Sequence, residues 1–238
     1  MVLAGIGTEL EGVHAVEAAL DAGRVISIEV EAPRVRRLAG LLDTAKARGV
    51  DIATVDRVVG VTEAPQGIRA VAEPLHTYDL YEFVEPAPAA LVVLDHLQDP
   101  HNVGAIARSA LAAGMTGIVV SDKRAAPLQA TAFKSAAGAL ERLRVCVHSS
   151  IADAVVRLQR AGVWVVGLSA DAETPVFGLS LFTEPVAVVV GAEGSGLSRL
   201  VRDRSDMTVR IPMASSVESL NASAAATLAM FEVGRVRS

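Results

Sequence analysis

Two stretches near the end of the chain decide the fold: VVVGAEGSG at residues 188–196 and RIPMASSVESLNASA at residues 210–224. The first is an apolar run that leads into a glycine-rich loop. The second joins a short apolar run, a proline, a polar loop and a helix of small residues. A glycine-rich loop after a buried strand lets a ligand approach the backbone, because glycine has no Cβ. Many strands also end in glycine turns that bind nothing, so these stretches alone leave both interpretations open.

A third stretch, LDHLQDPHNVGAIARSALAAG at residues 94–114, lies about a hundred residues upstream. It contains the pattern N-x-G-A-x-x-R, which begins at Asn102 and ends at Arg108. The residues themselves allow a plain structural interpretation, in which Asp99 or Asn102 caps a helix and Arg108 lies on its surface. The spacing puts Arg108 about two turns into that helix.

Together the three stretches resemble the motifs of the SpoU (TrmH) family of RNA ribose 2′-O-methyltransferases, in the SPOUT class. The other two motifs are G-x-E-x-x-G, which begins at Gly191, and I-P-M-x-x-x-x-x-S-L-N-x-S-x-A, which begins at Ile211. The resemblance implies S-adenosylmethionine (AdoMet) as methyl donor, a mostly parallel sheet with a deep trefoil knot, and a homodimer formed through the knot domain. The chain looks most like bacterial enzymes that methylate a guanosine ribose in 23S rRNA.

The resemblance also implies the site residues. The catalytic set is Asn102, Arg108, Glu193, Ser219 and Asn221, and the AdoMet-binding set is Leu168, Gly191, Ile211, Met213 and Leu220. No metal ligand is predicted. Methylating a 2′-hydroxyl requires an in-line methyl group, loss of the hydroxyl proton and a fixed ribose. A guanidinium is a poor base, so we expect Arg108 to clamp the RNA phosphate and hydroxyl. Glu193 is expected to orient Asn102 or Arg108, and Ser219 and Asn221 to order the site or the ribose. His101 lies in the same motif, but the pattern does not require it for catalysis.

Strands that alternate with helices predict an α/β fold in two domains. Residues 1–75 resemble the small L30e-like RNA-binding domain of the family, on the strings EGVHAVEAAL and PQGIRAVAEP. Residues 76–89 are expected to be a linker and residues 90–238 the catalytic domain. Short β-branched runs in the second domain are typical of parallel strands covered on both faces; they lie at 91–94, 117–121, 143–147, 163–168, 186–190 and 209–211. Helices are expected between them, at 103–113, 128–140, 151–161, 198–204 and 219–235.

Composition limits the function classes. The hydrophobic content of 51% predicts a packed globular protein, no apolar run reaches the length of a membrane helix, and the N-terminus does not resemble a secretory signal. A cytoplasmic protein is therefore expected, with the single cysteine, Cys146, as a packing residue. The formal charge of −5 argues against non-specific coating of nucleic acid, although a local basic surface suffices for an RNA enzyme. Candidate arginine clusters are Arg34/Arg36/Arg37, Arg142/Arg144 and Arg199/Arg202/Arg204.

Three other functions remain in view. A nicotinamide Rossmann enzyme is disfavoured, because its glycine motif follows the first strand, whereas here the glycines follow the fifth. A tRNA methyltransferase of the same family is an alternative that the motifs do not separate. A catalytically silent RNA-binding module is the third, and the intact set of five polar residues argues against it. A fragment that starts near Pro88 keeps every motif and is expected to fold alone.

Overall fold

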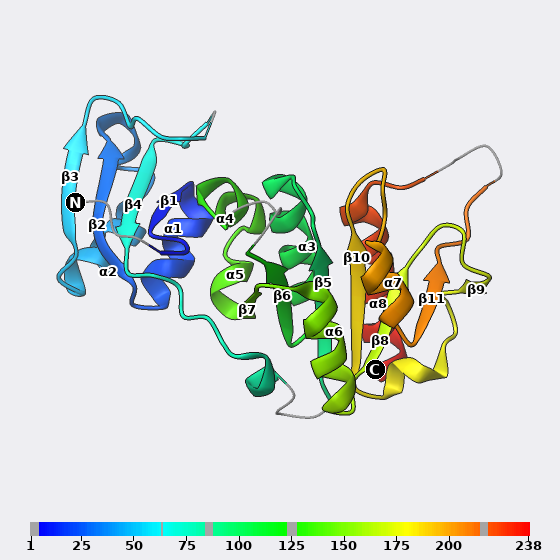
Figure 1. The fold of residues 1–238 in the computed structure, drawn as a ribbon. Coiled ribbons are helices and arrows are strands. Elements are labelled where there is room, and N and C mark those ends of the chain that lie inside the picture. The colour runs from blue at the N-terminus through cyan, green and yellow to red at the C-terminus, as the bar shows by residue number, and fades with distance from the viewer. Residues whose placement is uncertain (1–4, 63, 84–87, 123–127, 215–218) are drawn as a thin grey trace.

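The computed structural model describes residues 5–62, 64–83, 88–122, 128–214 and 219–238. The chain forms two sheets (Figure 1). We call the part around the four-stranded sheet the N-terminal unit and the part around the seven-stranded sheet the C-terminal unit. No helix in the described ranges combines the length and the apolar character that crossing a membrane requires.

The N-terminal unit has a mixed sheet in the order β1-β4-β2-β3. Its elements are β1 (Glu9–Glu11), α1 (Val13–Asp21), β2 (Val25–Glu31), the 3-10 helix η1 (Ala32–Arg34), α2 (Ala39–Ala47), β3 (Asp51–Val55) and β4 (Ile68–Ala72). Strand β2 pairs antiparallel with β4 and parallel with β3. Strands and helices alternate along this unit, as the sequence predicts for an α/β fold.

The C-terminal unit has an all-parallel sheet in the order β7-β6-β5-β10-β8-β11-β9. The strands are β5 (Ala90–Asp95), β6 (Gly117–Ser121), β7 (Arg144–His148), β8 (Trp164–Leu168), β9 (Thr174–Pro175), β10 (Val186–Gly191) and β11 (Met207–Arg210). Strands β5, β6 and β10 are buried along their whole length. The prediction of parallel strands covered on both faces is thus confirmed.

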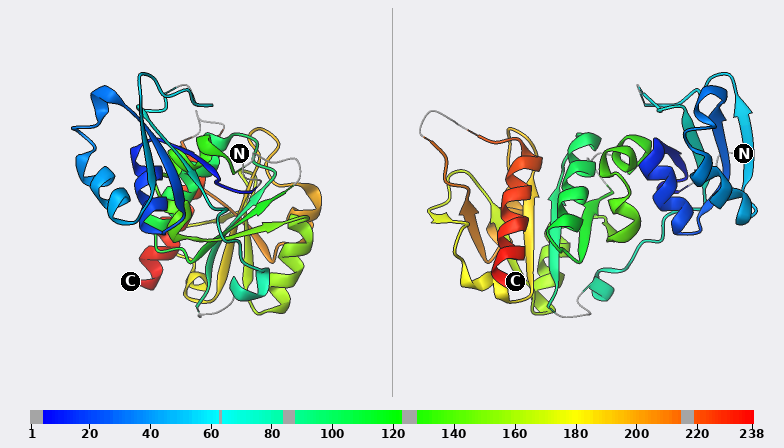
Figure 2. Two further views of the ribbon diagram at one scale, coloured as in Figure 1. Left: turned by 90° about the vertical axis from the view of Figure 1, so that its left-hand side faces the viewer. Right: turned by 180° about the vertical axis from the view of Figure 1, so that it is seen from behind.

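Helices cover both faces of this sheet (Figure 2). They are α3 (Pro100–Ala112), α4 (Ala130–Ala136), α5 (Ala139–Arg142), α6 (Ile151–Arg160), the 3-10 helix η3 (Ser180–Thr183), α7 (Arg199–Arg204) and α8 (Ala222–Arg237). Helices α3 and α8 lie side by side on one face, and α6 and α7 pack together on the other. The buried thiol of Cys146 lies on β7, and burial raises its pKa to about 11, as expected for a packing residue.

The single helix expected over 128–140 is broken into α4 and α5. The break lies at Ala137 (φ 48°) and Gly138 (φ 89°), which both have left-handed backbone conformations. A Cβ at Gly138 would lie 2.7 Å from the Cβ of Ala18, so the glycine also lets α1 approach this corner. Ala137 therefore ends α4, and Gly138 serves a contact between the two units.

The two units share a buried interface. The Arg24 guanidinium pairs with the Glu141 carboxylate, with Nε 2.9 Å from Oε2, and the Glu141 side chain is only 2% exposed. Gly7 lies directly against the ring of the buried Phe133. Removal of residues 1–87 would expose Phe133 and leave the Glu141 carboxylate without Arg24 as its partner. We therefore expect a fragment starting near Pro88 to be less stable than the full chain.

The segment expected to be a linker contains a packed turn. The 3-10 helix η2 (Leu80–Phe83) buries Leu80 and Phe83 in the same apolar cluster as Cys146 and the helix α6. Residues 84–87, which include Pro86, lie outside the described part of the chain. The turn therefore belongs to the packing of the C-terminal unit.

Candidate active site

The predicted site residues lie at the edge where the parallel strands end. In an open parallel sheet, ligands bind outside the carboxyl ends of the strands. Gly191 is the last residue of β10 and pairs in register with Asp95, the last residue of β5. The loop that follows β10 and the first turn of α3 therefore start from neighbouring points.

The Glu193 carboxylate joins two asparagines that are distant in sequence. Its Oε1 accepts a hydrogen bond from Asn102 Nδ2 at 2.6 Å and another from Asn221 Nδ2 at 2.9 Å. Sequence analysis left Asn102 and Arg108 open as partners of Glu193, and the contact is with Asn102. Three of the predicted catalytic residues thus form one connected cluster.

Helix caps fix the positions of both asparagines. Asp99 caps α3, with its Oδ1 accepting from the His101 amide at 2.8 Å, and this places Asn102 in the first turn. Asn221 caps α8, and its Oδ1 accepts from the amide and the hydroxyl of Ser223 at 2.8 Å and 2.6 Å. Because Oδ1 is used in this way, the Asn221 amide nitrogen is free to donate to Glu193.

The glycine-rich loop closes on itself behind Glu193. Ala192 and Gly196 exchange two backbone hydrogen bonds, of 3.0 Å and 2.9 Å. A Cβ at Gly191 would lie 2.1 Å from the carbonyl carbon of Gly196, and Gly194 and Gly196 have positive φ angles of 77° and 65°. Sequence analysis assigned the glycines to the close approach of a ligand. The structure gives a second reason, since the loop cannot close around a side chain at position 191.

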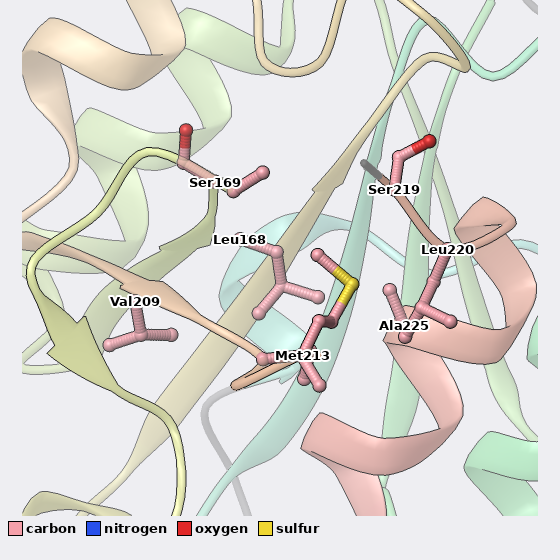
Figure 3. Close-up of a pocket in the computed structure, with 9 residues that line it drawn as sticks. Leu168, Ser169, Val209, Met213, Ser219, Leu220 and Ala225 are labelled. Atoms are coloured by element: carbon pink, nitrogen blue, oxygen red, sulfur yellow. The ribbon is translucent and has the colours of Figure 1, made fainter. Parts of the chain in front are cut away.

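Two adjoining hollows open beside this cluster, with volumes of about 120 Å³ and 440 Å³. Leu168, Ser219 and Leu220 line both of them. Ile211 and Met213 line the smaller hollow, and Gly191 and Glu193 line the larger. In Figure 3 the side chains of Leu168 and Met213 face each other, with Leu220 opposite them at the start of α8. All five residues predicted to bind AdoMet therefore line one continuous site.

The loop after β8, which begins at this site, is held by an ion pair. Asp171 accepts from Arg202 of α7 through both carboxylate oxygens at 2.6 Å and from Ser169 Oγ at 2.5 Å. The hydrogen bonds from Arg202 and Ser169 lower the pKa of Asp171 to about 2. The loop wall that carries Ser169 and Ala170 is thus tied to α7.

Arg108 lies away from the asparagine cluster. It lies six positions after Asn102 in the helix, which turns its side chain by about 120° and moves it about 9 Å along the axis. It is exposed, and within the described ranges it has no hydrogen bond or ion pair. Ser219 is also exposed and, among the described residues, has no hydrogen bond, although it lines both hollows. His101 is exposed in the first turn of α3.

Asp95 is a site residue that sequence analysis missed. Its carboxylate is fully buried at the end of β5. Oδ2 accepts from the amide of Ser198 at 2.6 Å, and Oδ1 lies 2.6 Å from Nδ1 of His96. Asp95 therefore anchors the far end of the glycine-rich loop to the sheet. The available signal was a carboxylate directly after the buried run ALVVL, because such a residue needs a partner.

Gly104 explains the glycine in the pattern N-x-G-A-x-x-R. A Cβ at this position would lie 2.4 Å from the carbonyl oxygen of Ala132 and 2.5 Å from the Cβ of Ser135. The glycine thus lets α3 and α4 pack with their backbones in close approach. Helix α3, which carries Asn102, is held in place by this contact.

The sequence pattern that defines the SpoU rRNA Methylase family matches residues 89–231. The chain belongs to that family. The pattern described as RNA 2′-O ribose methyltransferase substrate binding matches residues 10–78. The two patterns cover the C-terminal and N-terminal units, respectively, so both units of this SpoU protein match known sequence families.

Similar proteins support the assignment along the whole chain. A 23S rRNA (guanosine-2′-O-)-methyltransferase RlmB from Ralstonia nicotianae is 40% identical, with 96% of each chain covered. An RlmB from Xylella fastidiosa is 37% identical, with 95% of each chain covered. The SpoU methyltransferase AviRb from Streptomyces viridochromogenes, solved in complex with the cofactor AdoMet, superposes with a TM-score of 0.80 at 28% identity and covers 96% of this chain and 90% of its own. The chain therefore has the α/β fold of SpoU methyltransferases.

We expect Asp95→Ala to weaken AdoMet binding about tenfold, because a factor of ten corresponds to the free-energy cost of a buried amide left without an acceptor. The Ser198 amide would lose its acceptor, and the loop that carries Glu193 would be released. Asp95→Asn keeps an acceptor for that amide and should bind within about threefold of the wild type. Calorimetric titration with AdoMet measures both variants. Equal affinities for the alanine variant and the wild type would contradict the anchoring role.

Proposed function

We propose that this chain transfers a methyl group from AdoMet to the ribose 2′-hydroxyl of a guanosine in 23S rRNA, and that it acts in the cytoplasm. The observation that carries the proposal is the Glu193 carboxylate, which lines the larger hollow together with Asn221 and accepts hydrogen bonds from both Asn221 and the buried Asn102. The RlmB relatives support the choice of rRNA, because they match over nearly the whole chain.

The volume and the lining residues of the two hollows suit the chemical groups of AdoMet. The larger space, of about 440 Å³, lies in the range of small-molecule sites. The adjoining smaller hollow has an apolar wall of Leu168, Ile211, Met213 and Leu220 that suits an adenine ring, and the backbone of the glycine-rich loop, which lines the larger hollow, offers hydrogen-bonding groups. When bound, AdoMet supplies an electrophilic methyl group on a sulfonium.

The residues of the chain position the RNA and control its proton. Glu193 fixes the two asparagine amides, so the groups that face the ribose are arranged before RNA binds. Arginine carries five N–H donors in a planar fork. The unpaired guanidinium of Arg108 is free to bind an RNA phosphate and to make the adjacent 2′-hydroxyl more acidic. The proton then passes to water or to a phosphate oxygen.

The proposal is tested by methyl transfer from tritiated AdoMet to total RNA, followed by mapping of ribose methylation. We expect a single new site in 23S rRNA and none in transfer RNA. Methylation of transfer RNA alone would support the alternative substrate. AdoMet binding without any transfer to RNA would support the silent module.

We also propose a homodimer formed through the C-terminal unit. Helix α8 has an outward stripe at helical spacing that contains Leu228 and Phe231, which are 40% and 49% exposed. Exposed large apolar side chains on a helix that packs beside the site are typical of an interface between subunits. This face would be covered by the same face of a second copy.

Phe231→Asp should convert the dimer to a monomer, because a carboxylate would be buried without a partner. Light scattering after size-exclusion chromatography measures the mass. Leu200→Asp is a matched control, since Leu200 is a 58% exposed apolar residue on α7, and it should leave the dimer intact. A Phe231→Asp variant with the mass of the wild type would contradict this interface.

A further inference from the structure

Residues 169–173 cross the chain that leaves strand β11. Strand β9 follows β8 in sequence, but β11 lies between them in the sheet. Val209 of β11 is level with Leu168 of β8 on one side and with Thr174 of β9 on the other. Because all three strands are parallel, the segment that joins β8 to β9 must pass across the end of β11. We call residues 169–173 the crossing loop.

The crossing loop and the chain that it crosses line the same hollow. Ser169 and Ala170 line the smaller hollow of the proposed AdoMet site, together with Ile211 and Met213 of the chain that leaves β11. Ala170 also lines the larger hollow. Ser169 follows Leu168 directly where β8 ends (Figure 3). A movement of the crossing loop away from β11 would therefore open the site on this side.

Two arginines from different elements hold the crossing loop in place. Nη2 of Arg202, on α7, lies 2.6 Å from both carboxylate oxygens of Asp171. Nη1 of Arg210, on β11, donates to the carbonyl oxygen of Ala172 at 2.7 Å and to that of Glu173. The loop is thus tied on one side to α7 and on the other to the strand that it crosses.

The pair of Asp171 and Arg202 also connects the two loops that border the site. Helix α7 begins shortly after the glycine-rich loop, and the amide of Ser198 at its start donates to Asp95. The Asp171 and Arg202 side chains are 65% and 43% exposed, and an exposed ion pair contributes little to the stability of a folded chain. The pair therefore does more to set the distance between these two loops than to keep the chain folded.

We propose that Asp171 and Arg202 are positioning residues, which hold the crossing loop against β11 and so slow the release of bound AdoMet. Neither is among the described residues that line the two hollows, so both act through the wall residues Ser169 and Ala170. Because the apolar wall of the smaller hollow remains when the pair is lost, the dissociation rate should change more than the association rate. The inference rests on the proposed function only for the identity of the ligand as AdoMet.

The test measures the release of tritiated AdoMet from the full chain after addition of excess unlabelled AdoMet. Asp203→Asn is the matched control, because Asp203 is also an exposed carboxylate that pairs with an arginine of α7, Arg199, at 3.6 Å. We expect Asp171→Asn and Arg202→Gln to release AdoMet about fivefold faster than the wild type, on the scale of one exposed ion pair. Asp203→Asn should release AdoMet at the wild-type rate, because it breaks no contact with the crossing loop.

A charge exchange distinguishes the proposed clamp from a general loss of stability. Arg202→Asp alone should speed release, and the double variant Asp171→Arg/Arg202→Asp, which restores a pair of opposite charges, should regain most of the slow release. Melting temperatures should stay close to that of the wild type, because the pair is exposed. Release at the wild-type rate by Arg202→Gln overturns the proposal, as does faster release that Asp203→Asn shares or that the exchanged pair does not reverse.

These outcomes differ from a failure of the proposed function. A wild-type chain that binds AdoMet but methylates no RNA would contradict that function, while the release rates would still decide the role of the pair. A wild-type chain that binds no AdoMet would overturn both.

Discussion

Arg108→Ala should lower the rate of methyl transfer by at least ~100-fold and leave AdoMet affinity unchanged. This fall in rate is the size expected for the loss of an electrostatic contact to the reacting group. Unchanged affinity is expected because Arg108 lines neither of the hollows beside the glycine-rich loop. Single-turnover transfer of tritiated methyl and calorimetric titration with AdoMet measure the two quantities separately.

Two variants sharpen this prediction. Arg108→Lys should restore little activity, because a point charge does not reproduce bidentate contact with a phosphate. Arg160→Ala removes a charge from another exposed, unpaired arginine of the described chain and should retain the wild-type rate. An Arg108→Ala enzyme that methylates at the wild-type rate would make Arg108 an ordinary surface residue of α3.

Gly191→Val should abolish AdoMet binding. Any Cβ at this position would overlap the Gly196 carbonyl group, at 2.1 Å, so the loop that carries Glu193 could not close. The wall of the larger hollow and the contacts of Glu193 with both asparagines would be lost together. Calorimetric titration should give no heat of binding, and methyl transfer should fall below detection.

The control for this variant is Gly194→Asn. Gly194 lies in the same loop with a φ of 77° and open space around its Cα, and asparagine tolerates the left-handed conformation better than most residues. We expect only a small loss of affinity. Thermal unfolding of both variants tests whether the sheet remains folded. A folded Gly191→Val protein that binds AdoMet as tightly as the wild type would contradict the packing argument.

The parallel strands could be predicted because their apolar runs are short and rich in β-branched residues. The grouping of Asn102, Glu193 and Asn221 was expected only from the resemblance to a family, since no periodic pattern connects residues so far apart in sequence. Local rules left Asp99 and Asn102 as alternative caps of the first helix, and Asp99 is the cap of α3; the cap of α8 at Asn221 was not predicted. The residues of the site could thus be predicted from the family motifs, and the strands that position them could be predicted from short β-branched runs.

Features that depend on contacts between distant segments were not predictable. The break between α4 and α5 depends on the approach of Ala18 to Gly138, and the anchor at Asp95 depends on an amide about a hundred residues away. The direction of the Arg108 side chain follows from helix geometry. No described residue pairs with it, so the structure of the chain alone does not name the group that it binds. Sequence patterns describe single elements, whereas these features arise where elements meet.

The buried pair of Arg24 and Glu141 has a consequence for target selection. Together with the contact of Gly7 on Phe133, it joins the two units across a buried interface. This interface sets how the N-terminal unit, which matches the substrate-binding family over residues 10–78, is placed relative to the asparagine cluster. An RNA that binds both units at once must fit this arrangement, so we expect substitutions at Arg24 or Glu141 to alter which RNA is methylated as well as the stability of the chain.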